Sequence, residues 1–419
     1  MRRRRLRIVS TGHGRRVRQG QLVGNFAAQA VASCSRRGWS LNRSFSVLAI
    51  VLVAFSLVAC ASRPETGFLS AVAYSPPGAV DHTLLVATTR ERDERPGTLF
   101  NGDRATATDY AEITVSVPPN HKQGEIEWAS TPPGDPNVDF VVHDERYLDG
   151  DRAFVQALNA QLARRPPGSR KVFLFIHGFN TMFAEGLYRL AQLAHDSKAP
   201  GVPVLFTWAS RGKPTAYVYD LNSATAARDG LEHTFRLLLS SNAEEVNVLA
   251  HSMGNWVTVE AFRQIKISGD LSHADKIGNV YLAAPDIDID VFKSQMRRFG
   301  KPRKPFYIIL STDDRALFLS RTIAGGVTRV GDNPDVAELA ALGATVIDLS
   351  DLKATDSTNH DKFAQLATVG PELRGVLARG IPKDHQASDV GQTAVSGVGA
   401  VVSLPLTILG APIRIIAGQ

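Results

Sequence analysis

Residues 245–255, with the sequence E-V-N-V-L-A-H-S-M-G-N, restrict the possible folds of this chain more than any other stretch. Val246, Val248 and Leu249 form a short apolar run of strand length. After Ser252, apolar residues recur at helical spacing, namely at Trp256, Val257, Ala261, Phe262 and Ile265. A strand that passes through a tight turn into a helix, with a serine at the turn, is the arrangement called a nucleophile elbow.

Small residues flank this serine. Ala250 stands two positions before Ser252 and Gly254 two positions after it, so the motif is A-x-S-x-G rather than G-x-S-x-G. The turn of an elbow is strained and brings the strand and helix backbones close together, which excludes bulky side chains at both positions. The alternative interpretation is that Ser252 only caps the following helix. Other features of the sequence are needed to choose between a nucleophile elbow and a helix cap.

Strands and helices are expected to alternate around this stretch. Apolar runs predict strands at 80–89, 112–117, 172–176, 202–207, 246–250, 280–284, 306–310 and 345–349. Helices are expected at 153–163, around Phe183–Ala194 and around Ala227–Leu238. This alternation predicts one doubly wound α/β domain, with a mostly parallel sheet and helices on both faces. Ligands of such sheets bind beyond the carboxyl ends of the strands, where Ser252 is placed.

A second element follows the first buried parallel strand, at H-G-F-N, residues 177–180. A tetrahedral oxyanion needs two preorganised donors, and backbone N–H groups at strand ends can supply them. In elbow enzymes one donor follows the nucleophile, here Met253, and the other comes from the loop after this strand, here Phe179. An ordinary strand-to-helix turn would also account for the Gly178 position.

A serine nucleophile needs a base and an orienting acid, which follow it in the order acid, then histidine. Three histidines come after Ser252, and they are His273, His360 and His385. His360 follows the last expected strand through a polar loop, whereas His273 precedes a strand and His385 lies in the tail. Two acids end neighbouring strands, at Asp313-Asp314 and at Asp286, and a strand-end aspartate can also be only a helix cap.

The excess of positive charge in this chain comes from its first 59 residues. Residues 1–59 contain eleven arginines and no lysine or acidic residue, and the formal net charge of the whole chain is +6. Without these eleven positive charges the remainder carries −5. We therefore expect no nucleic-acid-binding surface in the body of the protein.

The leader is typical of an export signal. Residues 45–59 are apolar, follow arginines and end in small residues, and fifteen residues fall short of the roughly twenty that span a bilayer. The sequence L-V-A-C at 57–60 resembles a bacterial lipobox, in which Cys60 would be lipidated, and Ser35-Arg36-Arg37 resembles a twin-arginine signal. The alternatives are an uncleaved signal anchor with an unmodified Cys60, and a start codon placed too far upstream.

The chain is thus expected to divide into four parts. These are the export signal at 1–59, a Pro/Gly/Ser-rich tether at 60–77, the α/β domain at 78–385 and an apolar tail at 386–419. Pro405 and Pro412 argue against a spanning helix in the tail. It would pack on the domain, lie on a membrane or cover substrate.

Several short stretches together resemble one known family. They are V-A-T-T-R at 86–90, F-I-H-G-F-N at 175–180, L-F-T-W-A-S-R-G at 205–212, L-A-H-S-M-G-N at 249–255, Y-L-A-A-P-D-I-D at 281–288 and S-T-D-D-R-A-L at 311–317. The chain resembles the alpha/beta hydrolases, and specifically a bacterial family of unknown function, DUF900. The resemblance implies an alpha/beta-hydrolase fold and a serine hydrolase, and it favours Asp314 over Asp313 as the acid. Tyr217 and Asp220 match positions near the cleft without an assigned role.

Together these features predict an exported, lipid-anchored serine hydrolase of carboxylic esters with the triad Ser252, Asp314 and His360. Asp286 is the alternative acid, and no metal or organic cofactor is expected. The alternative functions are a long-chain lipase or thioesterase and a membrane-tethered interaction protein without turnover. The expected partners are a small-molecule or lipid ester and the membrane through Cys60, at the cell envelope and, by the Ala61 that follows, the outer membrane.

Overall fold

The computed structural model describes residues 63, 66–198, 201–269, 272–300, 302–333, 335–354, 356–366, 402–408 and 411–417. The chain divides into two compact units, Met1–Arg63 and Pro64–Gln419, and the fold below is that of the second unit. The expected export signal, Cys60 and His385 lie outside the described residues.

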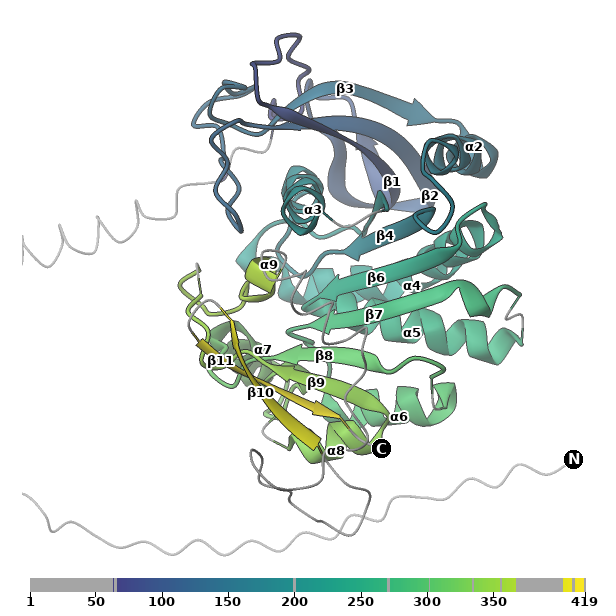
Figure 1. The fold of residues 1–419 in the computed structure, drawn as a ribbon, viewed down its shortest axis with the longest axis vertical. Coiled ribbons are helices and arrows are strands. Elements are labelled where there is room, and N and C mark those ends of the chain that lie inside the picture. The colour runs from purple at the N-terminus through teal and green to yellow at the C-terminus, as the bar shows by residue number, and fades with distance from the viewer. Residues whose placement is uncertain are drawn as a thin grey trace, which may run out of the picture. The chain divides into compact units, whose positions relative to one another are not determined.

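One eleven-stranded sheet runs through the described part of this unit, in the order β10-β11-β9-β8-β7-β6-β4-β5-β1-β2-β3 (Figure 1). The strands are β1 Val80–Asp93, β2 Leu99–Val117, β3 Val141–Leu148, β4 Lys171–Ile176, β5 Val202–Thr207, β6 Glu245–His251, β7 Ile277–Ala283, β8 Phe306–Leu310, β9 Ala344–Asp348, β10 Val402–Ile408 and β11 Ala411–Ala417. The seven central strands, in the order β9-β8-β7-β6-β4-β5-β1, are all parallel to their neighbours in this series. At the two edges, β2, β3, β10 and β11 pair antiparallel with their neighbours.

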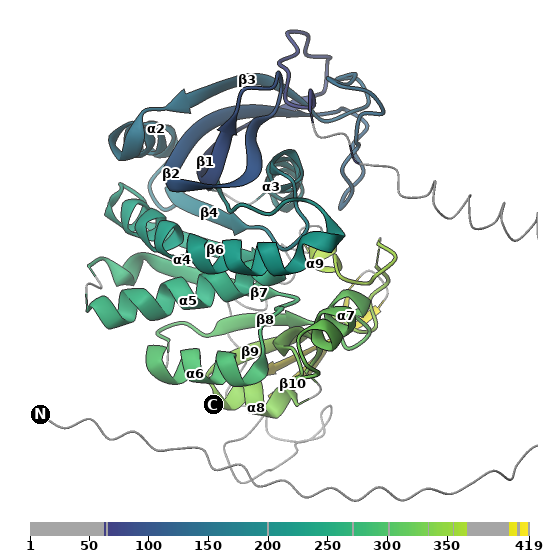
Figure 2. The same ribbon diagram turned by 180° about the vertical axis from the view of Figure 1, so that it is seen from behind.

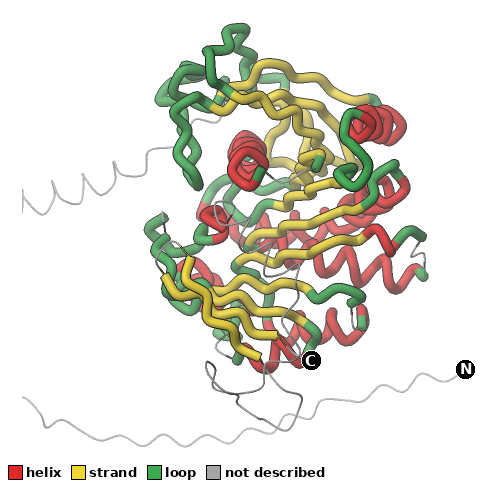
Figure 3. Tube along the Cα trace, in the orientation of Figure 1, coloured by secondary structure: helices red, strands yellow, loops and turns green. Residues whose placement is uncertain are grey.

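Helices cover both faces of the sheet, as the red and yellow elements in Figure 3 show. The α-helices are α2 Gly150–Ala163, α3 Phe183–Ser197, α4 Tyr217–Ser240, α5 Met253–Ser268, α6 Ile289–Phe299, α7 Arg315–Ile323, α8 Val336–Ala341 and α9 Phe363–Leu366. Helices α4, α5 and α6 lie side by side on one face (Figure 2), and their apolar residues join the core that contains Leu174, Val248 and Phe262. Helices α3 and α9 contribute to the core on the other face, which contains Leu187 and Phe363. The predicted doubly wound, mostly parallel α/β fold is confirmed.

All eight predicted strands lie within or largely overlap observed ones, because central strands buried on both faces read as continuous apolar runs. Strand β3 was not predicted. Its sequence V-V-H-D-E-R-Y-L carries charged side chains along its middle, which an edge strand exposed to water can tolerate.

Two observations bear on the expected ends of the domain. Phe68 and Leu69 lie within the stretch 60–77 expected as a tether, and both are buried. In the stretch 386–419 expected as a tail, β11 pairs antiparallel with β9 and β10 pairs with β11, so this segment extends the sheet. None of the described helices is both long and apolar enough to cross a membrane.

Candidate active site

Ser252 stands at the turn between β6 and α5, with a φ of 52° and a ψ of −124°. Such backbone angles are strained for a residue other than glycine and persist only where neighbours fix them. Here the Ser252 N–H donates to the Ala283 carbonyl at 2.9 Å, and the Ser252 carbonyl accepts from the Asn255 side-chain amide at 2.9 Å and the Asp286 N–H at 3.2 Å. The loop after β7 therefore holds the strained turn in place.

The two glycines near this turn are required by close backbone approaches. A Cβ on Gly254 would lie 2.4 Å from the His177 carbonyl oxygen, and a Cβ on Gly178 would lie 2.7 Å from Cβ of Ser252. Contacts this short are not tolerated, so both positions need glycine. The elbow and the loop after β4 are thus in contact, and Phe179 follows the glycine that approaches Ser252.

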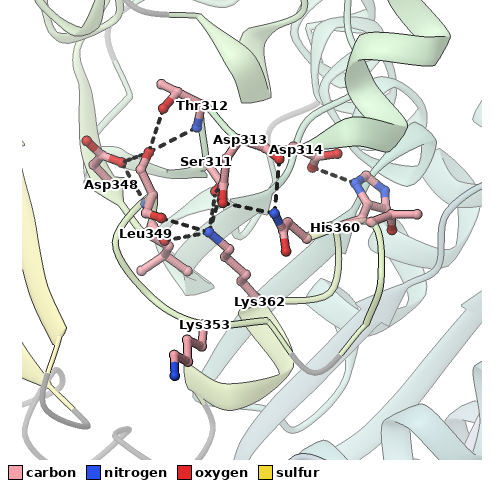
Figure 4. A network of polar contacts seen from close by, with 12 residues as sticks. Ser311, Thr312, Asp313, Asp314, Asp348, Leu349, Lys353, His360 and Lys362 are labelled. Atoms are coloured by element: carbon pink, nitrogen blue, oxygen red, sulfur yellow. Dashed lines mark hydrogen bonds and ion pairs between the residues drawn. The ribbon is translucent and has the colours of Figure 1, made fainter.

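The predicted base and the preferred acid are joined by a hydrogen bond. Nδ1 of His360 lies 2.7 Å from Oδ2 of Asp314, whose side chain is fully buried (Figure 4). Asp314 follows β8 and also caps α7, because its Oδ1 accepts from the Leu317 N–H at 2.9 Å. Since a carboxylate only accepts, Nδ1 of His360 carries the proton and Nε2 is left for a second partner.

The electrostatics of His360 suit a base that operates near neutral pH. Burial lowers its pKa, but the hydrogen bond and the charge of Asp314 outweigh burial and raise the pKa to about 8. The ring of His360 lies 4.6 Å from the ring of His251, the residue that precedes Ser252 in the chain. No hydrogen bond joins the Ser252 hydroxyl to His360 among the described residues, as is common in ligand-free hydrolases, where catalytic hydrogen bonds tighten on substrate binding.

The alternative acid belongs to a different group of side chains. Oδ1 of Asp286 accepts from the Ser320 hydroxyl at 2.6 Å and lies 3.2 Å from Nε of Arg329, and its Oδ2 accepts from the Tyr217 hydroxyl at 3.3 Å. No described hydrogen bond links Asp286 to His360. Asp286 does not cap α6 either, because Asp288 accepts from the Asp290 and Val291 N–H groups there.

The remaining histidines near the elbow are neutral. Nδ1 of His177 donates to the Gly178 carbonyl at 2.8 Å and its Nε2 accepts from the Trp208 N–H at 3.2 Å, while burial and the Arg90 charge hold its pKa well below the ordinary value. Burial and the neighbouring His360 lower the pKa of His251 to about 3. His273 is exposed and lies before β7, at the opposite edge of the sheet.

With this geometry in place, comparison with known proteins identifies the family. The profile of a family described as "Alpha/beta hydrolase of unknown function (DUF900)" matches residues 151–377, which is more than half of the chain. The chain belongs to this family.

Two solved structures are similar to this DUF900 hydrolase. A fungal esterase from Rhizomucor miehei has 14% identity and a TM-score of 0.30, over 80% of this chain and 91% of that one. Esterase B from Lactobacillus rhamnosis, solved with a tributyrin phosphonate inhibitor, has 11% identity and a TM-score of 0.26, over 80% of this chain and 99% of that one. No curated protein matches the sequence.

In this DUF900 hydrolase the loop at 177–181 is held by two buried charged residues to which the sequence assigned no role. Arg90, from β1, donates to the Thr181 carbonyl at 2.8 Å and to the Ser210 carbonyl at 2.8 Å. Asp220, from α4, accepts from the Asn180 N–H at 3.2 Å and from the Ser210 hydroxyl at 2.5 Å. Burial lowers the pKa of Arg90 to about 10, so its charge is retained near neutral pH, and burial raises the pKa of Asp220.

A third buried charge, Lys362, fastens the loop that carries His360. Its Nζ donates to Oδ1 of Asp313 at 2.7 Å, to the Ser311 hydroxyl at 2.9 Å, and to the Leu349 and Ser350 carbonyls at 3.1 and 2.9 Å (Figure 4). Asp313, the neighbour of the preferred acid, thus serves the loop and not the histidine. Lys362 was not singled out from the sequence, because a lysine next to a loop is usually a solvated one.

No group of three or more potential ligands among the described residues has the geometry of a metal site. A histidine held by a buried aspartate is chemically able to activate a hydroxyl, and the loop at 177–180 contacts the turn of Ser252 through Gly178.

Proposed function

We propose that this alpha/beta hydrolase is a serine esterase that cleaves carboxylic esters through an acyl-enzyme intermediate. The observation that carries the proposal is the 2.7 Å bond between Asp314 and His360, next to a serine held in the strained elbow conformation. A buried aspartate that fixes the tautomer of a histidine, close to a serine at a strained turn, is the arrangement that acyl transfer requires.

The reaction follows from the proton inventory of these groups. Nε2 of His360 takes the Ser252 proton as the serine oxygen forms a bond to the acyl carbon, and the carbonyl electrons move to the oxygen. When this oxyanion collapses, the bond to the alcohol oxygen breaks and the imidazolium delivers its proton to the leaving alkoxide. Water then repeats the two steps on the acyl-enzyme and restores the serine.

The oxyanion would be bound by the N–H groups of Phe179 and Met253. Backbone donors stabilise the charge well because they are already oriented before the reaction. Asp314 holds the imidazole ring and stabilises its charged form, and this stabilisation is the cause of its raised pKa.

A fluorophosphonate probe tests this function, because only an activated serine reacts with it. We expect wild-type protein to be labelled and to hydrolyse an aryl ester, and Ser252→Ala to lose both properties. Ser240→Ala is the matched control, since Ser240 is exposed at the far end of α4. Unlabelled wild-type protein would favour the alternative of an interaction protein that keeps the fold without turnover.

We further propose that the protein is exported and anchored through a lipidated Cys60 at the outer membrane. Support comes from the apolar segment at 45–59, the L-V-A-C sequence and the absence of an aspartate after the cysteine. Several acyl chains anchor a protein stably, whereas one chain binds only marginally. Wild-type protein should then fractionate with the outer membrane, and Cys60→Ser should release it or leave an unprocessed precursor. A mature protein with an unmodified Cys60 would end this proposal.

A further inference from the structure

The outer side of helix α7 exposes large apolar side chains. Phe318 and Leu319 are each 59% exposed and Ile323 is 55% exposed, while Leu317 and Ser320 point inward and are buried. Soluble proteins rarely leave several large apolar residues exposed on one short helix without a functional reason. The loop that follows continues this exposure to Val327, which is 38% exposed.

The start of α4 adds to the same surface. The Tyr217 hydroxyl lies 2.9 Å from the Ser320 hydroxyl, so the first turn of α4 is joined to α7. Next to Tyr217, Val218 is 66% exposed and Leu221 is 39% exposed. We name this surface the apolar face and define it by the exposed residues Val218, Leu221, Phe318, Leu319, Ile323 and Val327.

The apolar face borders the candidate active site. Helix α7 begins at the residue after Asp314, and the Phe179 ring of the oxyanion loop lies 5.2 Å from the Tyr217 ring at the start of α4. A surface on which the apolar face rested would therefore lie next to the candidate active site. Whatever binds the apolar face would therefore lie close to the substrate of the candidate active site.

Exposed basic side chains border this face. Of the three arginines at 315–331, Arg321 lies 3.2 Å from Asp332 and Arg329 is buried against Asp286. Arg315 is exposed at the start of α7, and Lys213 is exposed just before α4. Apolar side chains next to cationic ones match a membrane surface, where acyl chains lie below anionic headgroups.

The chain enters the folded unit at this same edge of the sheet. Phe68 lines a cavity of about 560 Å³ together with Met182 and Ser210, which follow the carboxyl ends of β4 and β5. Helix α7 follows the carboxyl end of β8, which is parallel to both through the intervening strands. The first buried residues and the apolar face are therefore on the carboxyl edge of one sheet.

Chain length then limits how far this edge can lie from an anchored cysteine. Phe68 lies eight positions after Cys60 in the sequence. Even a fully extended chain spans at most about 3.5 Å per residue, so roughly 28 Å. A lipidated Cys60 would therefore keep Phe68 within about this distance of the bilayer, which allows the carboxyl edge of the sheet to reach it.

We propose that the apolar face docks on the membrane surface, so that the substrates of Ser252 are esters resident in that membrane. This inference rests on the proposed esterase function and anchoring. A lipid surface is favoured over a second copy of the chain or a soluble protein, because both the exposed Arg315 and Lys213 and the point of chain entry are consistent with it.

Docking is tested with the full chain in a Cys34→Ser, Cys60→Ser background, which removes both native thiols. An environment-sensitive fluorophore is attached at Phe318→Cys or, as the matched control, at Ile267→Cys. Ile267 is apolar and 47% exposed near the end of α5, at the opposite edge of the sheet. Both proteins contain the apolar segment at 45–59, so any vesicle binding through this segment is common to both, and a difference between the labels reports the orientation of the domain.

With vesicles of phosphatidylethanolamine and phosphatidylglycerol, we expect the label at 318 to shift to the blue and to be quenched by brominated acyl chains. The label at 267 should do neither. Equal behaviour of the two labels would overturn docking. A shift of the label at 318 that grows with protein concentration in the absence of vesicles would show that a second copy of the chain covers the apolar face. A label that is already buried without vesicles and at low concentration would show that the chain itself covers it. Either result also overturns the proposal.

The substrate class is tested by comparing an ester embedded in these vesicles with a short, soluble ester of the same alcohol. In the triple variant Phe318→Ser, Leu319→Ser, Ile323→Ser, the ratio of the vesicle rate to the soluble rate should fall at least about tenfold. Ile267→Ser should leave the ratio unchanged. An unchanged ratio in the triple variant overturns the inference. Wild-type protein that hydrolyses neither ester overturns the proposed function instead. The fluorescence experiment needs no activity, so it still tests docking in that case.

Discussion

Asp314 and His360 are 46 residues apart in the sequence, yet Oδ2 of the first lies 2.7 Å from Nδ1 of the second. Two strand ends bring them together, because Asp314 follows β8 and the loop of His360 follows β9, its parallel neighbour. Asp286 follows β7, one strand further along the sheet, and is hydrogen-bonded to Ser320 instead. This difference makes the two acids separable by experiment.

Asp314→Asn should lower kcat by roughly 10³–10⁴ with little change in KM, because an amide cannot fix the same tautomer of His360. Asp286→Asn should leave kcat within about tenfold of wild type and should instead reduce the free energy of unfolding by about 1–3 kcal/mol, since it weakens buried bonds to Ser320 and Arg329. Both variants are measured on one aryl ester and by urea unfolding. A large loss of kcat in Asp286→Asn alone would make Asp286 the acid.

The pH dependence follows from the raised pKa of His360. A general base must be neutral, so kcat/KM should rise with pH through a midpoint near 8. The charge of Asp286 also raises this pKa, and Asp286→Asn should therefore move the midpoint to lower pH. Initial rates across the range from pH 6 to 10 give both values (roughly two units on either side of the midpoint). A midpoint that stays fixed in Asp286→Asn contradicts this electrostatic account.

Burial and polarity explain which features of the fold and the site could be predicted from the sequence. The central strands could be located because parallel strands covered on both faces must be apolar throughout, as V-F-L-F-I at 172–176 illustrates. The elbow could be located because its geometry restricts residue size at Gly254. Arg90, Asp220 and Lys362 could not be assigned, because charged residues are usually exposed and only the folded chain supplies the partners that make their burial possible.

The choice between Asp286 and Asp314 was open for a related reason. Both are aspartates at strand ends, and topology places both at the edge where Ser252 emerges. What separates them is a side-chain contact set by the loop of His360, and that loop is shaped by Lys362 and Asp356. Oδ2 of Asp356 accepts from the His360 N–H at 3.1 Å, and no periodic pattern in the sequence encodes such a turn.

Lys362→Met should loosen this loop. The change leaves the Ser311 hydroxyl and two carbonyl groups without their donor, at a cost of about 1–3 kcal/mol in the free energy of unfolding. Displacement of His360 should lower kcat by roughly 10- to 100-fold with KM nearly unchanged, because the base and not the binding surface moves. Lys353→Met is the control, since Lys353 lies in the same loop with an exposed side chain (Figure 4). Equal kinetics in the two variants, with Lys362→Met still folded, would remove Lys362 from the positioning of the base.

Asp220→Asn tests whether the loop at 177–181, the proposed source of an oxyanion donor, depends on the buried side chain of Asp220. One carboxylate oxygen of Asp220 accepts from the Arg211 N–H at 3.0 Å, and the other accepts from the Asn180 N–H and the Ser210 hydroxyl. An asparagine has a single oxygen, so in either orientation its NH₂ group faces a backbone donor and one of the two segments must move.

If Phe179 supplies an oxyanion donor, a displaced loop weakens binding of the transition state more than that of the substrate. Asp220→Asn should therefore lower kcat by about 10²–10³ while KM changes little, and it should slow fluorophosphonate labelling in parallel, because the phosphonate oxygen occupies the oxyanion position. The midpoint of the pH profile should stay near 8, since His360 keeps Asp314. Asp229→Asn, at an exposed position on the same helix, should match wild type in all three measurements. A loss of stability in Asp220→Asn with unaltered kcat and labelling rate would show that Asp220 supports the fold alone.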